Sequence, residues 1–218
     1  MNGQALVEAV RESQATELDR LGSDKYLIAA TGADLERAPV LRSVAESAAS
    51  GRDAFRRWAE AATGEAATAF ETAADVEVDH FDRVAESLAA LPDDGADAAA
   101  TIDGGDAPLT DALAGFEDPA ERVAAAFVGR PLVADRALLQ VVNFFVNEAD
   151  ENRADLAREL RSDAQRRLDE GADLLDAVCE TDADYERARR AAEEVVAAAY
   201  DDYATALEAM GVDPKPVC

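Results

Sequence analysis

Apolar residues recur every three or four positions along almost the whole chain, which is the spacing of a helix that buries one face. In the stretch 65–91, for example, Phe70, Ala73, Val84 and Leu88 share one face. No segment shows the alternation of apolar and polar residues that a half-buried strand requires. The pattern therefore predicts an all-α fold.

The same periodicity sets the expected helix bounds. We expect helices over residues 3–31, 41–62, 65–91, 109–116, 119–128, 134–178 and 184–210. Gly129-Arg130-Pro131 is expected to end the helix before it, since proline cannot continue the hydrogen-bond ladder. Residues 92–108 are rich in Asp, Gly and Ala, and they are expected to form a flexible loop. One domain is predicted, with the N-terminal helices in 1–91 and a C-terminal helical hairpin in 109–218.

Charge is the next constraint. The 218 residues include 47 acidic and 21 basic ones, for a formal net charge of −26, and Lys25 and Lys215 are the only lysines. A surface this acidic stays hydrated in concentrated salt, which also screens its self-repulsion. We therefore interpret the chain as coming from a halophile.

The same charge argues against a nucleic-acid partner, because the phosphate backbone would be repelled. Two helices near the C-terminus carry clusters of arginines interleaved with acids. These arginines are expected to form ion pairs within their own helices: Arg161, Arg166, Arg167, Arg187, Arg189 and Arg190.

Nothing in the sequence indicates export or membrane insertion. The N-terminus lacks a basic patch followed by an apolar run. The longest apolar stretch, Ala137–Val146, is too short to cross a membrane and contains Gln140 and Asn143. Cys179 and Cys218 form neither a CxxC motif nor a disulfide framework. A cytoplasmic protein without a membrane partner is expected.

The only histidine, His80, lies on the apolar stripe of its helix, one turn after Glu77. A carboxylate and an imidazole that face the interior of a helical bundle are the smallest unit of a carboxylate-bridged metal site. They also suit a hydrogen-bonded pair without metal. Both interpretations require the two side chains to point inward.

Other polar residues fall on apolar faces of the first two predicted helices, namely Gln14, Glu17, Lys25 and Arg52. A buried charge without a partner is costly, so these groups must pair with one another, with a metal or with water. Glu17 is the expected partner of Glu77 and His80.

The run Phe70 to Phe81 resembles the F-x-x-x-A-x-x-E-x-x-H helix of rubrerythrin-like proteins in the ferritin-like superfamily, with Phe70, Ala74, Glu77 and His80 at its defined positions. The tail 211–218 is similar to that of haloarchaeal proteins labelled rubrerythrin-family. The resemblance implies a ferritin-like antiparallel four-helix bundle, extended by the C-terminal hairpin. It also implies that Glu77 and His80 occupy metal-ligand positions.

The chain departs from that family in its metal ligands. A di-iron site needs a second inward glutamate and histidine pair, and this sequence has no second histidine. The paired CxxC motifs of the family's electron-transfer iron centre are also absent. Full di-iron peroxidase or ferroxidase activity is therefore not expected.

Three functional interpretations follow. The favoured one is a non-enzymatic protein with a metal-free core network, formed by Glu17, Lys25, Arg52, Glu77 and His80. The second is a redox protein that binds one iron, manganese or zinc ion through Glu17, Glu77 and His80, with Tyr26 nearby. The third is a regulator that acts through a protein partner, since some haloarchaeal relatives carry a transcription-antitermination label. The long C-terminal helices are the expected surface of a homodimer.

Overall fold

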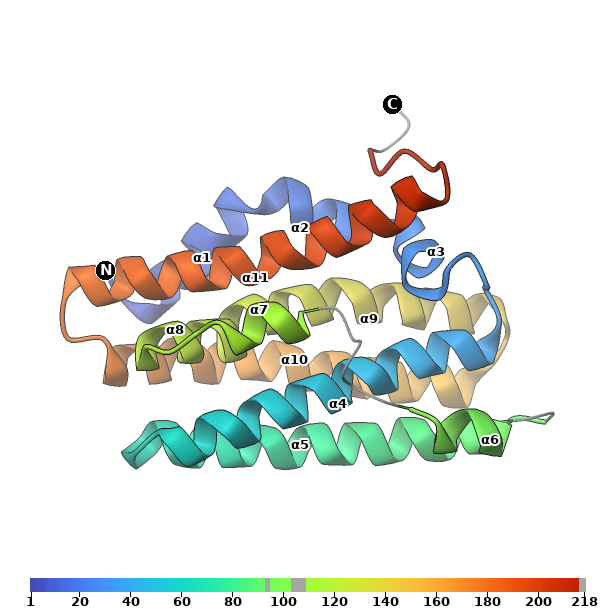
Figure 1. The fold of residues 1–218 in the computed structure, drawn as a ribbon, viewed down its shortest axis with the longest axis horizontal. Coiled ribbons are helices and arrows are strands. Elements are labelled where there is room, and N and C mark those ends of the chain that lie inside the picture. Colours follow the sequence, from blue (N-terminus) through green and yellow to red (C-terminus); the bar gives the residue numbers. More distant parts are fainter. Residues whose placement is uncertain (93–94, 103–108, 216–218) are drawn as a thin grey trace.

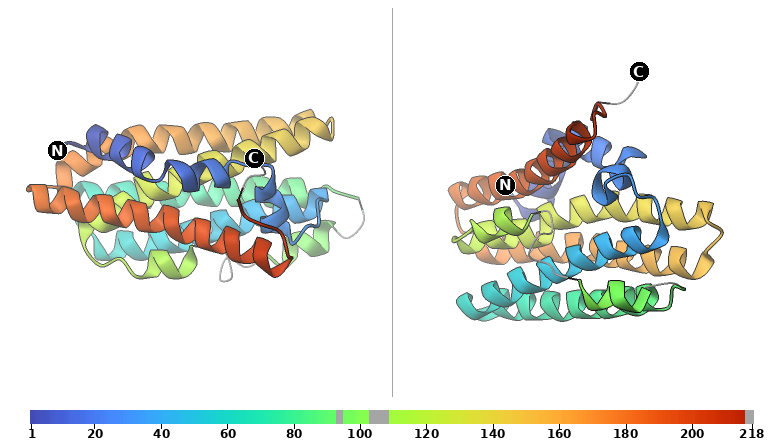
Figure 2. Two further views of the ribbon diagram at one scale, coloured as in Figure 1. Left: turned by 90° about the horizontal axis from the view of Figure 1, so that it is seen from above. Right: turned by 45° about the vertical axis from the view of Figure 1, so that its right-hand side comes forward.

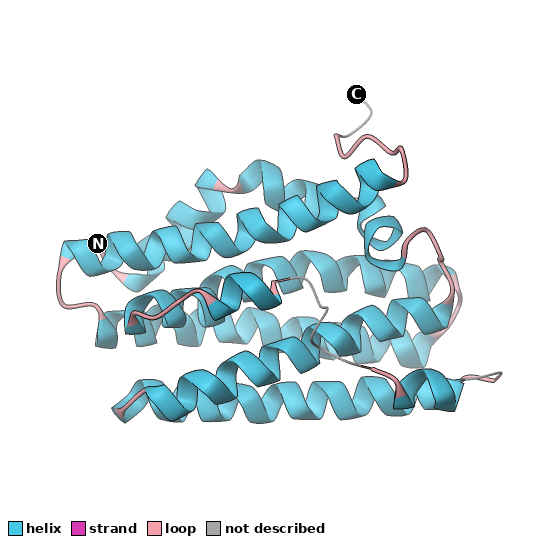
Figure 3. Ribbon diagram, in the orientation of Figure 1, coloured by secondary structure: helices cyan, strands magenta, loops and turns pink. Residues whose placement is uncertain are grey.

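The structure is a computed structural model that describes residues 1–92, 95–102 and 109–215, and all regular secondary structure in these ranges is helical (Figure 3). This confirms the predicted all-α class. The elements are α1 (Gly3–Ser13), α2 (Ala15–Leu21), α3 (Lys25–Thr31), α4 (Arg37–Ala61), α5 (Gly64–Ala89), α6 (Gly95–Ala100), α7 (Thr110–Ala114), α8 (Pro119–Ala124), η1 (Ala125–Gly129), α9 (Arg130–Asn147), α10 (Glu151–Val178) and α11 (Asp182–Ala209).

The helices are stacked in three layers (Figure 1). The antiparallel pair α4 and α5 forms one outer layer, and α9 with α10 forms the middle layer. The third layer consists of α11 and the N-terminal helices α1 to α3, which pack against one another and cover the middle layer (Figure 2). The short helices α7 and α8 lie at the side of the middle layer, against α11.

The predicted helix over 3–31 is wrong, because three helices replace it. The first break is at Gln14. Beside it, the hydroxyl of Ser13 donates to the backbone carbonyl of Val10, a local bond that competes with the helical pattern. The second break covers Gly22 to Asp24, residue types that favour turns. The two breaks let the chain bend around α11.

The predicted helix over 134–178 is also wrong, because it is two antiparallel helices, α9 and α10. The turn between them contains Ala149 in the left-handed region, with a φ of 54°. Asp150 then caps α10, since its side chain accepts a hydrogen bond from the backbone N–H of Arg153. The helical hairpin of the middle layer is therefore formed by α9 and α10.

Gly129-Arg130-Pro131 does not end a helix, contrary to the prediction. The chain passes from α8 through the π-helical turn η1 directly into α9. A wide π turn tolerates the missing N–H of Pro131, and such turns shift the register of all later residues by about 100°. A Cβ at Gly129 would lie 2.8 Å from the backbone oxygen of Ala192, so glycine allows this turn to pack closely against α11.

The predicted loop over 92–108 is only partly a loop, since Gly95–Ala100 forms the short helix α6 on α5. Residues 93–94 and 103–108 lie outside the described residues. The predictions for 41–62, 65–91 and 184–210 agree with α4, α5 and α11 to within a few residues. In the described part of the chain, no helix is both long enough and apolar enough to span a membrane.

The hydrophobic core is divided into two clusters. One lies around Phe55, Phe70 and Phe127, and the other around Leu88 and Phe145. Helices α4, α5, α9 and α10 contribute to both clusters. Along α5 the buried positions Glu77 and His80 fall between the residues of the first cluster and those of the second. The boundary between the clusters is therefore polar.

Candidate functional site

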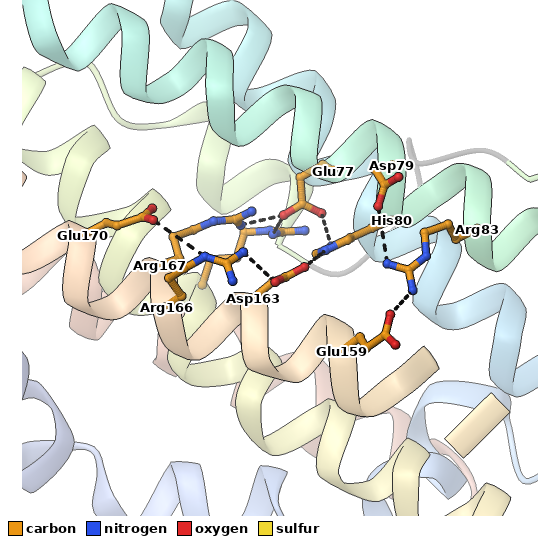
Figure 4. A network of polar contacts seen from close by, with 10 residues as sticks. Glu77, Asp79, His80, Arg83, Glu159, Asp163, Arg166, Arg167 and Glu170 are labelled. Carbon is orange, nitrogen blue, oxygen red and sulfur yellow. Dashed lines mark hydrogen bonds and ion pairs between the residues drawn. The ribbon is translucent and has the colours of Figure 1, made fainter. Parts of the chain in front are cut away.

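Glu77 and His80 point into the molecule, as predicted, and are 3% and 7% exposed. Their helix α5 buries this face against α4, and α10 lies opposite. Two further charged side chains are buried to the same extent, Arg130 and Arg167, each 7% exposed. Three helices thus bring four polar residues to one interior position, where Figure 4 shows Glu77, His80 and Arg167.

Both arginines bind the same oxygen of Glu77. Nη1 of Arg130 and Nη1 of Arg167 each donate a hydrogen bond of 2.6 Å to Oε1. Burial alone would raise the pKa of Glu77, but the positive charges of Arg130 and Arg167 outweigh it and lower the pKa to about 2. The carboxylate is therefore ionised at neutral pH and is held between two guanidinium groups.

Residues of α4 contact the two guanidinium groups on another side. Each lies 5.4 Å from the ring centre of Phe55, which allows a cation–π contact. Nη2 of Arg130 also donates to the backbone carbonyl of Ser47, at 2.6 Å. At Gly51 a Cβ would overlap the guanidinium of Arg130, so the absence of a side chain there makes room for it.

His80 connects this cluster to the surface. Its Nε2 lies 2.9 Å from Oδ2 of Asp163, and Oδ1 of Asp163 accepts a 2.6 Å bond from Arg166. Burial alone would raise the pKa of Asp163, but its hydrogen bonds to His80 and Arg166 outweigh that and lower the pKa. An ionised carboxylate can only accept, so Nε2 of His80 carries the proton. Nδ1 lies 3.9 Å from Oε2 of Glu77, too far for a hydrogen bond.

Exposed ion pairs extend the network on both sides (Figure 4). Arg166 lies 3.8 Å from Glu170, and Arg83 pairs with both Asp79 and Glu159. Exposed pairs of this kind contribute little to stability. The energetically important part of the network is the buried one.

The remaining predicted interior residues are not part of this cluster. Glu17 lies on α2, which packs against α9 and α11 rather than α5. Lys25 donates from Nζ to the backbone carbonyls of Asp213 and Lys215 near the end of the described chain. Arg52 binds its neighbour Asp53.

Gln14, the last of the predicted interior residues, is half-buried at the junction of α1 and α2. The structure thus leaves all four of these predicted interior residues, Gln14, Glu17, Lys25 and Arg52, only partly buried. Glu17 and Lys25 follow the break at Gln14, so a pattern taken along one continuous helix over 3–31 does not hold for them.

The cluster does not suit a metal ion. In the described residues, no three His, Cys, Asp or Glu side chains are arranged to hold one. The two guanidinium groups occupy Oε1 of Glu77, and a divalent cation at that oxygen would meet two positive charges. Glu17, the third expected ligand, lies on α2, which packs against α9 and α11 rather than against α5.

Sequence reasoning missed Asp163, Arg130 and Arg167. Arg167 was expected to pair within α10, as Arg166 does, but it binds across to α5 instead. One signal was present, since Arg167 lies seven residues after Leu160 and seven before Leu174, on the apolar stripe. Arg187 and Arg189 do pair within α11, as expected.

A cavity of about 60 Å³ adjoins the cluster. Its polar wall contains Tyr26, Ser43, Ser47, Glu77, His80, Arg130 and Arg167. Its apolar wall comes mainly from α9 and α10, with Ala137, Leu138, Leu160 and Ala164. The cluster therefore faces a small space that is polar on one side and apolar on the other.

Comparisons with known proteins do not assign this site. No family model matches the chain, and no curated protein and no solved structure matches it either. Any functional conclusion therefore depends on the geometry and charge of the site itself.

Proposed function

We propose that this is a non-enzymatic helical protein in which a buried ion-pair network takes the place of a metal centre. The observation that carries the proposal is the position of the two arginines, both at 2.6 Å from Oε1 of Glu77. Two fixed guanidinium charges neutralise the inward carboxylate, which is what a metal ion would do in a metal-binding bundle. The proposal therefore gives the network a structural role rather than a catalytic one.

The proposal retains the ferritin-like, rubrerythrin-related origin as an inference from the residues of α5. Glu77 and His80 keep the spacing of the metal-ligand helix. The two antiparallel pairs, α4 with α5 and α9 with α10, are compatible with a four-helix bundle. We infer that arginines at positions 130 and 167 stabilise a site from which the other metal ligands have been lost.

Two features argue against a catalytic role for His80. Its Nε2 proton is directed to Asp163. Its other nitrogen faces Glu77, a carboxylate already bound by two arginines. A general base needs a free nitrogen within hydrogen-bond reach of a substrate proton. We therefore assign His80 a structural role, as the connection between Glu77 and Asp163.

Metal analysis tests the proposal. The protein is purified without added metal, incubated with iron, manganese or zinc, desalted, and analysed by mass spectrometry for bound metal. We expect roughly a tenth of an equivalent or less. Glu77→Ala and His80→Ala are analysed in parallel, with Glu71→Ala on the exposed face of α5 as the control. Stoichiometric metal that is lost in both variants but kept in the control would overturn the proposal and favour the single-metal redox interpretation.

Activity and partner assays complete the test. Peroxide turnover and RNA binding are measured on the same sample, and neither is expected. RNA binding is disfavoured by the net charge of −26. Size-exclusion chromatography with light scattering tests the predicted homodimer. Turnover of peroxide that depends on His80 would contradict the non-enzymatic assignment.

A further inference from the structure

The helical hairpins α4–α5 and α9–α10 leave an open groove between them. It has a volume of about 900 Å³ and lies between residues 64–76 of α5 and residues 163–174 of α10. The two stretches are antiparallel, because Glu77 binds Arg167 while His80, later in α5, meets Asp163, earlier in α10. Each stretch is roughly 18 Å long at 1.5 Å per residue, so the groove is about as long as three turns of helix.

The floor of the groove is apolar. It consists of small or aliphatic side chains of the two helices and one aromatic ring of η1, namely Ala69, Ala73, Val76, Phe127 and Leu174. On the α5 edge, the side chains of Thr68 and Thr72 are short and exposed. Helices approach one another more closely where the side chains at the contact are short. The groove therefore suits a third helix better than a small molecule, which needs a concave pocket that buries most of its surface.

The rim of the groove carries two carboxylates without a partner. Glu65 on α5 and Asp173 on α10 both line the groove and are exposed. Among the described residues, neither has a hydrogen-bond or ion-pair partner. Unpaired carboxylates are expected on a surface with a net charge of −26, but these two flank an apolar floor. That combination distinguishes the groove from an ordinary solvated face.

The arginines of the groove do not offset this charge, because each is already bound by a carboxylate. Arg166 donates to Asp163 and Arg167 donates to Glu77, both at 2.6 Å. Figure 4 shows Arg166 beside Glu170 as well, at 3.8 Å. The groove thus presents negative charge that is not neutralised, and it favours a positively charged occupant.

These features select among possible occupants. A second copy of this chain would bring another net charge of −26 to an acidic rim, so it is disfavoured. A helix with one apolar face flanked by lysines or arginines matches both the floor and the rim. Its apolar face would cover the floor, as in other complexes of a helix in a groove.

We propose that the groove between α5 and α10 binds a basic amphipathic helix of a partner protein, with the apolar face on the floor and the cationic flanks at Glu65 and Asp173. This inference goes beyond the proposed function, which concerns the buried network, and it does not depend on whether that network is metal-free. The protein is then an adaptor or regulator that acts by holding such a helix.

Fluorescence anisotropy with a labelled model peptide tests this proposal. The peptide has about 14 residues, with leucines at i, i+3, i+4 and i+7, lysines on both sides of that face and alanines elsewhere. A scrambled peptide of the same composition lacks the apolar face. Titrations in roughly 0.5 M KCl screen the long-range attraction of any cationic peptide to so acidic a protein. We expect one peptide per chain, with a Kd of roughly 1–100 μM that is at least about tenfold tighter than for the scrambled peptide.

A double variant tests the charges of the rim. Glu65→Gln with Asp173→Asn removes the two free carboxylates and should weaken binding about fivefold, which is the scale of two exposed ion pairs. The matched control is Glu71→Gln with Asp169→Asn, which removes the same charge from exposed positions of the same helices outside the groove. The control should bind the peptide as the parent does.

A single variant tests the position of the binding site. Thr72→Arg places a long cationic side chain in the groove and should weaken binding by more than about tenfold, through steric overlap and like charge. Thr16→Arg, exposed on α2 and outside the groove, is the matched control. Circular dichroism checks that each variant keeps the helix content of the parent.

Absence of saturable binding of the amphipathic peptide up to about 1 mM would overturn the proposal. Equal affinity for the scrambled peptide would do so as well, because it would show attraction by charge alone. The same holds for unchanged binding in Thr72→Arg, or for equal affinity when the lysines of the peptide are replaced by glutamates. Light scattering tests the second copy: a dimer that Thr72→Arg dissociates and Thr16→Arg retains would assign the groove to self-association instead.

Discussion

Glu77 is the residue whose ionisation most affects the interior, because its pKa is lowered to about 2 from an ordinary 4.5. A carboxylate with a lowered pKa in the folded state contributes stability above its unfolded pKa and loses it as the pH falls toward the folded pKa. The shift corresponds to a contribution on the order of 3 kcal/mol at pH 7. It should disappear between about pH 4.5 and pH 2.

Glu77→Gln should therefore be less stable than the parent by about 3–5 kcal/mol at pH 7, since it leaves two buried arginines without a charged partner. The difference should shrink below pH 4.5. Urea denaturation at a series of pH values measures it, with Glu71→Gln on the exposed face of the same helix as the control. If the stability difference stayed constant down to pH 2, the negative charge of Glu77 would not be its cause.

Among the elements, α4 determines whether Arg130 can reach Glu77. A Cβ at Gly51 would overlap the guanidinium of Arg130. Gly51→Ala should destabilise the fold by about 1–2 kcal/mol, because the steric conflict exceeds the gain of about 1 kcal/mol in helix propensity. Urea denaturation midpoints measure the effect.

Gly115→Ala at the end of α7 is the control for that substitution. Its φ is −77° and the new methyl would meet its nearest neighbour, the backbone oxygen of Ala112, at 3.5 Å. We expect a change within about 0.5 kcal/mol there. If Gly51→Ala proved more stable than the parent, Arg130 would have to be mobile enough to make room.

For the molecule as a whole, surface charge and interior charge should respond differently to salt. The net charge of −26 is spread over the surface helices, where its repulsion is screened as the Debye length falls from about 10 Å at 0.1 M salt to about 3 Å at 1 M. The melting temperature should therefore rise steadily with KCl over this range. Thermal denaturation followed by circular dichroism measures it.

The stability difference between the parent and Glu77→Gln should change by less than about 0.5 kcal/mol over the same salt range, because buried pairs are screened little. Urea denaturation at each salt concentration provides this comparison. A melting temperature that fell with added KCl would argue against the halophilic interpretation. A large salt dependence of the Glu77→Gln difference would instead place that carboxylate in contact with solvent.

Much of the local structure could be predicted from the sequence. The helical class, the bounds of α4, α5 and α11, and the inward orientation of Glu77 and His80 follow from a period of 3.6 residues, which the residues of one helix display by themselves. The positions of the helix breaks were harder to predict. Ala149 and Asp150 are compatible with a helix interior, and the turn there is stabilised by a left-handed residue and a cap.

Only the tertiary structure decided the partners of Glu77. The π turn at Ala125–Gly129 shifts the register of α9 so that Arg130 meets α5, and the turn at Ala149 folds α10 back so that Arg167 does too. The predicted partner, Glu17, lies between the two breaks, on α2, which packs against α9 and α11. Periodicity specifies which side of a helix is buried, but it carries no information about which other helix covers that side. The sequence by itself thus determined that a carboxylate and an imidazole lie inside an all-α protein, and the packing of three helices decided that arginines bind that carboxylate.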